Sequence, residues 1–455
     1  MQLLIALQSS CLVALGSGFW IPSQQTSLRV LYAFLGWGRN NLNTALPQLL
    51  AASANLSCAQ TERAYNPDLE GNRWDGGSDN LEADLAPWRG RAPLSAADIP
   101  GAYMTVLQTM NIPAVIQLAL IYNNRLYWPN RPDPNGGEPT RLWASYFVIH
   151  FHRRLTAALA SGRLVLPNAL FIYNTDDNAP RFNAPGRKLP VPLLSLIKSQ
   201  GLEGGDDLDI LVPQMYMVQS SMFFVPWHLK TDRAFFRGMP FCNSVWRSRY
   251  GVLDACARLY LSHLSYQGLL AGGNDTTLDC GLAEPFKHRL DSPNTFLKYD
   301  LPVLGRVPFP DHAHYKWLLN LEGITASSRL GQLFHINSLV ISQRSPYLEY
   351  FYRSLRPWEH YVLFWNATAP NGTQLGMDDV YSTIEELRRL DREQPWKIQE
   401  VISAANSFAV RFLQPHTRLW YYQEAITRYK SLFRDMDNFL ESFVQALRQK
   451  GWLIP

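Results

Sequence analysis

Two serines and an arginine stand just beyond a glycine in the stretch HYKWLLNLEGITASSRLGQLF. The apolar run before Gly323 predicts a buried strand, and the residues after it predict a helix with Thr325 at its N-cap. Ser327, Ser328 and Arg329 would then occupy the first helical turn, where free N–H groups and the positive end of the dipole attract anions. This pattern favours a diphosphate site, and an exposed polar first turn is the alternative.

Arginines with similar chemistry occur in the stretch KTDRAFFRGMPFCNSVWRSR. Arg237 and Gly238 end a predicted strand there, and Arg247 and Arg249 follow it. Glycine lets a ligand approach the backbone closely, and the arginine fork suits bidentate contact with phosphate. The alternative interpretation is a group of surface arginines.

Two adjacent carboxylates, Asp176 and Asp177, follow the predicted strand in NALFIYNTDDNAP. A carboxylate that points into a cleft between two domains can act as a general base. On local grounds alone, an Asx turn ahead of Pro180 is the better interpretation.

The spacing of other polar residues does not indicate a metal site. The His-x-His pairs at 150–152 and 312–314 have no further ligands at a suitable spacing. Asp-x-Asp occurs at 207–209, in a predicted linker, and at 435–437, inside a predicted helix. We interpret both as solvated charge, so no metal site is expected.

These residues must be positioned by alternating strands and helices, which indicate a parallel sheet covered on both faces. A long surface loop around short elements is expected at 59–100, a loop at 131–140, and a domain linker at 181–208. The pattern predicts strands at 112–122, with a hairpin-like turn after it, and at 168–174, 208–218, 233–238, 315–323, 338–343 and 359–365. It predicts helices at 141–162, 248–264 and 325–334, from about Asp378 or Asp379, and at 397–413 and 417–451.

Composition places the chain among ordinary globular proteins. It has 455 residues, of which 47% are hydrophobic and 18% charged, enough for two domains with a substantial core. A net charge of +4 without long basic runs does not indicate nucleic-acid binding.

The N-terminus suggests the secretory pathway. MQLLIALQSSCLVALGSGFW is apolar and free of acidic residues, so a cleaved signal is favoured over an uncleaved anchor or a buried helix. If Cys11 is removed with it, four cysteines remain, which allow three pairings; they are Cys58, Cys242, Cys256 and Cys280. Four Asn-x-Ser/Thr sequons agree with this route; they begin at Asn55, Asn274, Asn366 and Asn371.

The block from His314 to Phe364 resembles the signature of the Rumi-type protein O-glucosyltransferases and the capsule-associated glycosyltransferases, which together form glycosyltransferase family ninety. The matching residues are Lys316, Asn320, Gly323, Ala326, Ser327, Arg329, Glu349, Pro357, Trp358, His360 and Tyr361. The turn at Asp177 and the Arg237-Gly238 segment are similar to two further motifs of the family. The resemblance extends, with weaker stretches, from about Asn123 to Leu413.

This resemblance implies an α/β fold of the GT-B type, with two Rossmann-like domains facing a cleft. The expected division is a leader or anchor at 1–18, an acceptor and catalytic-base domain at 19–205, a nucleotide-sugar-binding domain at 206–395, and helices packing across the domains at 396–455.

It also implies inverting, metal-independent transfer of a sugar, glucose or xylose, from a UDP-sugar to a hydroxyl of a protein serine or a glycan. Asp177 matches the base, while Asp176 and His360 are candidates for supporting the site without touching the donor. For His360, packing is the favoured interpretation. The residues expected to bind the donor are Arg237, Gly238, Arg247, Lys316, Asn320, Gly323, Ser327, Arg329 and Glu349.

Two departures from the family pattern leave an alternative open. Asp176 replaces an arginine beside the base, and Ala179 lengthens the turn by one residue. Met239-Pro240-Phe241 replaces small hydroxyl residues after Gly238. The alternative is a lumenal binding protein that keeps the fold and has lost turnover. The implied partners are a UDP-sugar and a glycoprotein or polysaccharide in the endoplasmic reticulum or Golgi, with membrane contact only through an N-terminal anchor.

Overall fold

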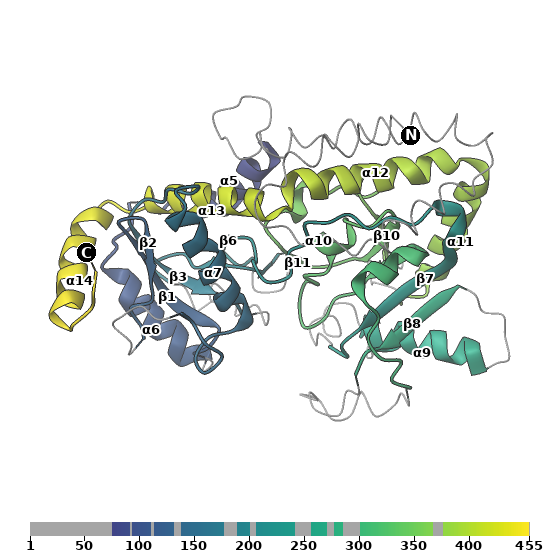
Figure 1. Ribbon diagram of the computed structural model, residues 1–455, viewed down its shortest axis with the longest axis horizontal. Helices are drawn as coiled ribbons and strands as arrows, with labels where there is room; N and C mark the ends of the chain where they lie inside the picture. The colour runs from purple at the N-terminus through teal and green to yellow at the C-terminus, as the bar shows by residue number, and fades with distance from the viewer. Residues whose placement is uncertain are drawn as a thin grey trace, which may run out of the picture. The chain divides into compact units, whose positions relative to one another are not determined.

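The described part of the chain forms two five-stranded sheets, one two-stranded sheet and surrounding helices (Figure 1). This architecture confirms the predicted fold class, α/β of the GT-B type. All of it lies within one compact unit, Trp74–Pro455. The computed structural model describes residues 75–91, 93–110, 113–131, 138–176, 189–200, 206–241, 256–270, 277–284, 301–366 and 376–454.

The first sheet has the strand order β2-β1-β3-β4-β6 and mixed directions. The parallel arrangement expected from the sequence holds only for β3, β4 and β6, because β1 is antiparallel to both β2 and β3. A tight hairpin joins β1 to β2, as predicted, and Asn123 and Asn124 adopt positive φ angles of 48° and 56° there. The strands are β1 Ile116–Tyr122, β2 Arg125–Tyr127, β3 Ala169–Asn174, β4 Leu194–Ser195 and β6 Ile210–Leu211.

The second sheet has the order β12-β10-β9-β7-β8, and all of its strands are parallel, as predicted. The strands therefore end along one side, which we call the carboxyl edge, and begin along the other, the amino edge. Ligands of open parallel sheets bind beyond the carboxyl ends of the strands. The strands are β7 Thr231–Gly238, β8 Leu278–Leu282, β9 Tyr315–Asn320, β10 Leu339–Gln343 and β12 Val362–Phe364.

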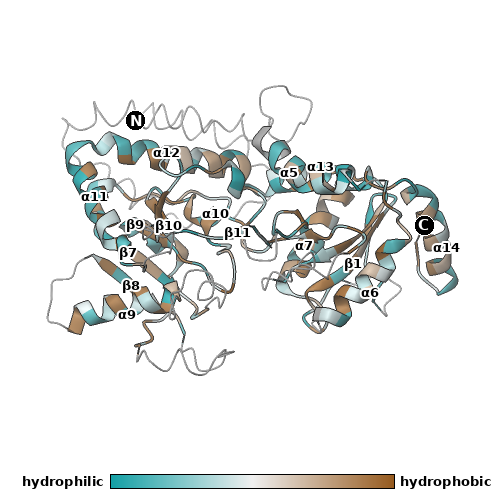
Figure 2. Ribbon diagram, turned by 180° about the vertical axis from the view of Figure 1, so that it is seen from behind, coloured by the Kyte–Doolittle hydropathy of each residue, from teal (hydrophilic) through white to brown (hydrophobic). Residues whose placement is uncertain are grey.

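Helices pack against the apolar side chains of this sheet. Helix α9 packs against β8, α11 against β12, and α12 against β10. Figure 2 colours α11 as largely hydrophilic, since only one face of it is buried. Asp378 precedes α11, as predicted. The helices are α9 Ala257–Leu270, α11 Asp379–Glu393 and α12 Pro395–Phe412.

The expected loop at 59–100 is wrong for its described part, which contains α5 Asp75–Arg89 and the start of α6 Asp98–Met110. Leu81, Leu85 and Trp88 are fully buried and recur at helical spacing. This apolar face outweighs the Asp, Gly and Pro residues that suggested a loop. Helix α7 Tyr146–Ala160 agrees with its prediction and is capped by Ser145.

The linker expected at 181–208 is also wrong for its described part. Residues 189–200 contain β4 and β5 Lys198–Ser199, and nearly all of them are buried. Strand β5 pairs antiparallel with β11 Tyr347–Leu348. This two-stranded sheet links the two halves of the sequence through backbone hydrogen bonds.

The Asp-x-Asp pair at 207–209 is buried and not solvated, contrary to the prediction. Asp207 accepts hydrogen bonds from the backbone N–H and the hydroxyl of Ser199, at 2.8 and 2.5 Å. Asp209 accepts one from Ser195, and Lys198 pairs with Asp84. Burial raises the pKa of Asp209 to about 7. The partners come from distant segments, so the sequence pattern could not reveal them.

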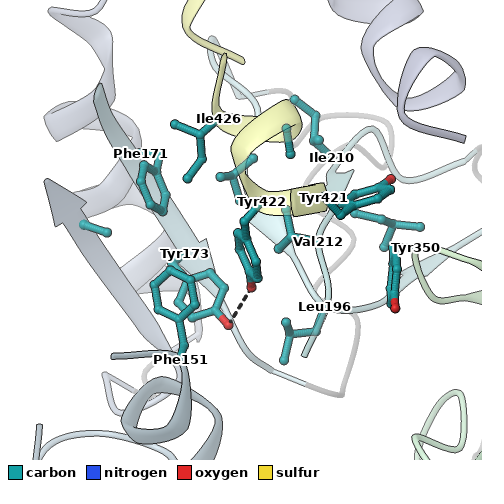
Figure 3. Packing of buried hydrophobic residues seen from close by; sticks show 14 of the residues in the cluster. Phe151, Phe171, Tyr173, Leu196, Ile210, Val212, Tyr350, Tyr421, Tyr422 and Ile426 are labelled. Atoms are coloured by element: carbon teal, nitrogen blue, oxygen red, sulfur yellow. Dashed lines mark hydrogen bonds between the residues drawn. The ribbon is translucent and has the colours of Figure 1, made fainter. Parts of the chain in front are cut away.

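The C-terminal stretch expected as one helix divides into α13 Pro415–Lys430 and α14 Met436–Gln449. Asp435 lies at the break and accepts a 2.7 Å hydrogen bond from the backbone N–H of Ala96. The Asp-x-Asp at 435–437 therefore begins a helix and anchors another segment. Figure 3 shows Tyr422 of α13 packed within the core of the first sheet. Its hydroxyl lies 3.2 Å from the hydroxyl of Tyr173.

Several predictions concern residues outside the described part of the chain. These are the leader, three of the sequons, Cys58 and Cys242, and the site residues Asp177 and Arg247. The fourth sequon, at Asn366, is exposed. Among the described helices, none combines the length and apolar character that a membrane span requires.

Candidate functional site

Two predicted site residues from separate stretches meet at the carboxyl edge. Gly238 is the last residue of β7, and Arg329 follows the end of β9 in the next loop. A Cβ atom at position 238 would lie only 3.0 Å from Nη2 of Arg329. The side chain of Arg329 therefore rests against the backbone at the end of β7, which only glycine leaves open to this degree.

Arg329 carries a positive charge that no carboxylate of the described residues neutralises by an ion pair. Its guanidinium carbon lies 4.9 Å from the centroid of the Phe236 ring. Burial lowers the pKa of Arg329 to about 10, so it remains charged at neutral pH. An unpaired, partly desolvated arginine beside a glycine at a strand end is suited to hold an anion.

The helix expected at 325–334 is mostly absent, and this corrects the dipole argument. Helix α10 comprises only Leu330–Leu333, and Arg329 itself occupies the cap position. Thr325 is not an N-cap: its side chain is buried, and its hydroxyl has no hydrogen-bond partner among the described residues. A single helical turn has little macrodipole. Any attraction for anions here comes from the guanidinium.

Arg258, which the sequence analysis did not single out, lies behind the same edge. It comes from α9, is 6% exposed, and donates hydrogen bonds to the carbonyl oxygens of Met239 and Leu321. A signal existed in the sequence, since Arg258, Leu261 and Ser262 share a helical face that is buried. A charge on such a face needs a specific partner.

Gly323 is explained by this arginine. A Cβ atom at position 323 would lie 3.1 Å from Nη2 of Arg258 and 3.2 Å from Cβ of Phe241. Gly323 was predicted to be one of the donor-binding residues. In the structure, its missing side chain makes room for Arg258.

Arg237 lies at the end of β7, but its guanidinium is paired with Asp279 of the neighbouring strand β8, at 2.6 Å. Tyr315 donates a second hydrogen bond to the same carboxylate, at 2.7 Å. Nε of Arg237 is buried and has no hydrogen-bond partner among the described residues. The charge of Arg237 is thus largely neutralised within the protein.

His312 adds no positive charge to this region at neutral pH. Its ring contacts the ring of Phe235, with the centroids 4.8 Å apart. Burial, together with the charges of Arg329 and Arg237, lowers the pKa of His312 to about 4.

The loop that carries Arg329 rests on Tyr352. The hydroxyl of Tyr352 lies 3.3 Å from the carbonyl oxygen of Ser327 and 3.4 Å from a carboxylate oxygen of Glu349. Burial raises the pKa of Glu349 to about 7. Ser327 and Glu349, both predicted to bind the donor, are therefore linked through one tyrosine.

Asn320 ends β9 and is buried beside this loop. Its amide donates a 3.0 Å hydrogen bond to Ser342 of β10. Its side-chain oxygen is buried and has no partner among the described residues. A buried, unsatisfied acceptor at the carboxyl edge is available to a ligand donor group.

Two predicted site residues lie elsewhere. Lys316 is at the amino edge, where it forms a 2.6 Å ion pair with Asp391 of α11. His360 packs against the ring of Phe408, with the centroids 5.3 Å apart, and accepts a 3.2 Å hydrogen bond from the backbone N–H of Arg356. The contacts of His360 agree with packing, which was the favoured interpretation.

The structure describes the end of β3 as far as Asp176. This residue is 4% exposed, and its backbone N–H donates to the side chain of Asn174 at 3.0 Å. Thr175 beside it contacts Ser145, the cap of α7, at 2.8 Å. The described residues contain no group of three or more His, Cys, Asp or Glu side chains placed to hold a metal ion.

Comparison with known proteins agrees with the class that the fold and the edge define, an α/β protein of the GT-B type. Residues 212–437 match the model of Glycosyl transferase family 90. This match confirms the resemblance to that family predicted from the sequence.

Relatives with assigned names are similar over parts of their length. Protein O-glucosyltransferase 3 of Homo sapiens is 25% identical over 287 residues, which cover 59% of this chain and 48% of that protein. O-glucosyltransferase rumi of Drosophila pseudoobscura pseudoobscura is 32% identical over 133 residues, covering 29% and 30%. Protein O-glucosyltransferase 1 of Rattus norvegicus is 30% identical over 128 residues, covering 28% and 29%. The chain therefore spans half or less of the length of these relatives.

Proposed function

We propose that this protein is a glycosyltransferase that moves a sugar, glucose or xylose, from a UDP-sugar to a serine hydroxyl of a protein, with inversion and without a metal. The observation that carries the proposal is the position of Arg329, which lies against Gly238 at the carboxyl edge and forms no ion pair with the described residues. The names of the relatives, which are protein O-glucosyltransferases, favour a protein acceptor over a glycan.

The chemistry divides between the two sheets. The departing UDP gathers negative charge, and a preorganised arginine stabilises that charge without a metal ion. Arg329 takes this role, and the buried acceptor of Asn320 is available to a donor group of the nucleotide sugar. The acceptor hydroxyl needs a base, which contributes roughly 10²–10⁴-fold. We assign this role to Asp177, which follows β3 and precedes the region that matches the family model.

We further propose that the protein works in the lumen of the secretory pathway, the endoplasmic reticulum or the Golgi. The apolar N-terminal segment and the four sequons support this location. A sequon that is exposed, as Asn366 is, can accept a glycan during secretion. Such a compartment is oxidising and permits disulfide bonds.

Release of UDP from UDP-glucose and UDP-xylose tests the activity, with and without an acceptor domain. The wild-type protein should release UDP, and Asp177→Asn should lower the rate by at least about 100-fold while leaving UDP affinity unchanged. Equal release by both proteins would remove Asp177 from the mechanism. Binding of UDP without release by either protein would favour the alternative of a lumenal binding protein.

A further inference from the structure

Arg258 is a buried arginine that binds backbone carbonyl oxygens. It is 6% exposed, and it donates hydrogen bonds to two of them. It lies on the buried face of α9, which packs against β8. A charge at this depth is costly unless its hydrogen bonds are made.

The bonds of Arg258 join the ends of two strands. Nη1 donates to the carbonyl of Met239, the residue after β7, at 3.0 Å. Nε and Nη2 donate to the carbonyl of Leu321, the residue after β9, at 3.3 and 3.1 Å. The chain leaves each strand at these residues, so one guanidinium fixes both exits.

The same guanidinium lies close to the candidate site. Its carbon is 5.6 Å from the centroid of the Phe236 ring, over which Arg329 also lies, at 4.9 Å. Two positive charges are thus held near one aromatic ring at the carboxyl edge. Their fields add at the position where an anion would approach Arg329.

We propose that Arg258 is a positioning residue for the nucleotide diphosphate. It holds the exits of β7 and β9 so that Gly238 and Arg329 stay together, and its charge strengthens the attraction for the diphosphate. This inference rests on the proposed function, because it assumes that UDP binds at the carboxyl edge.

Gly323 supports the position of Arg258 by leaving space for its guanidinium. A side chain at position 323 would press on the guanidinium of Arg258, with Cβ only 3.1 Å from Nη2. Gly323→Ala should therefore weaken UDP binding by displacing Arg258, although position 323 need not touch the ligand. The effect depends on the arginine being present.

The first test measures UDP affinity by calorimetry for full-length Arg258→Lys and Arg258→Gln. Lysine keeps the charge but cannot bridge both carbonyls, so UDP affinity should fall about tenfold. Glutamine also loses the charge, so affinity should fall further and depend less on ionic strength. Arg388→Lys is the matched control, since Arg388 lies at the amino edge of the same sheet and bonds to Asp232; its UDP affinity should equal that of the wild type.

The second test combines Gly323→Ala with Arg258→Lys. If Gly323 acts through Arg258, the loss of affinity in the double variant should be smaller than the product of the two single losses. Losses that simply multiply, or an Arg258→Lys protein that folds and binds UDP as the wild type does, would overturn the inference. If Arg258→Lys does not fold, Gly323→Ala decides alone: unchanged UDP affinity would overturn the inference. Failure of the wild type to bind UDP would instead refute the proposed function.

Discussion

The two edges of the second sheet treat positive charge in opposite ways. At the amino edge, Lys316 pairs with Asp391 at 2.6 Å, and Arg388 pairs with Asp232 at 3.1 Å. At the carboxyl edge, Arg329 forms no ion pair with the described residues, and burial lowers its pKa. One edge therefore uses its cations to hold α11 against the strands, and the other leaves one available.

Arg237 is intermediate between these cases. It belongs to the carboxyl edge by position, yet its 2.6 Å ion pair with Asp279 resembles the amino edge. Sequence position alone thus does not say which arginine is available to a ligand. The difference between Arg237 and Arg329 lies in a carboxylate on the neighbouring strand.

Among the substitutions that compare the two edges, replacing Arg329 should have the largest effect on UDP binding. Arg329→Met should weaken UDP binding by about 100-fold, because charge-assisted hydrogen bonds to the diphosphate are lost. The unliganded protein should be at least as stable as the wild type, since the substitution removes a partly desolvated charge that forms no ion pair with the described residues. Calorimetry and thermal unfolding check the two effects. If the Arg329→Met variant binds UDP as tightly as the wild type, or is less stable than the wild type, the comparison of the two edges is contradicted.

Glu349, which contacts the loop of Arg329 through Tyr352, should make the stability of the protein depend on pH. Burial raises its folded pKa to about 7, above the ordinary value of 4.5, so its contribution to stability is complete below about pH 4.5 and is lost as the pH rises through 7. Glu349→Gln removes this dependence. Relative to the wild type, the variant should gain roughly 2–3 kcal/mol in free energy of unfolding between pH 5 and pH 8.

Denaturant unfolding at several pH values measures this gain. His312→Gln is the opposite control, because burial lowers the pKa of His312 to about 4, so wild-type stability falls as the pH drops from about 6.5 to 4. Relative to the wild type, the free energy of unfolding of His312→Gln should rise as the pH is lowered. A constant difference between Glu349→Gln and the wild type would show that the carboxyl is not buried as described.

The smallest effect is expected at the amino edge. Lys316→Met removes the ion pair with Asp391 and should cost about 1 kcal/mol of stability. UDP affinity should not change, because Lys316 begins β9 and the candidate site lies beyond its end. Chemical unfolding and calorimetry together check this. A tenfold loss of UDP affinity would restore Lys316 to the donor site and break the comparison of the two edges.

The sequence predicted the parts of the site that depend on local order along the chain. The strand that ends at Gly238 was predicted to that residue, while the strand that ends at Asn320 was predicted to continue to Gly323. A parallel sheet places the two ends together. Arg329 was predicted as a site residue because it follows one of these strand ends in the sequence. The helix predicted at this position was not observed at its expected length, because a turn closes between Leu330 and Ser327 and places Arg329 at the cap.

Features that depend on distant partners could not be predicted. Asp207 and Asp209 were interpreted as solvated, but segments far along the chain bury them and satisfy them. The pairing of Arg237 with Asp279 depends on the order of strands in the sheet. The burial of Arg258 could have been inferred from its helical face, but its carbonyl partners carry no signature in the sequence.

The central claim, that the carboxyl edge binds the diphosphate of a nucleotide sugar, is tested most directly by titrating the wild-type protein with UDP and with uridine. The account predicts that UDP binds at least about 30-fold more tightly than uridine, because only UDP places charged oxygens against Arg329. Equal affinities for the two, or no binding of UDP by the folded protein, would contradict it.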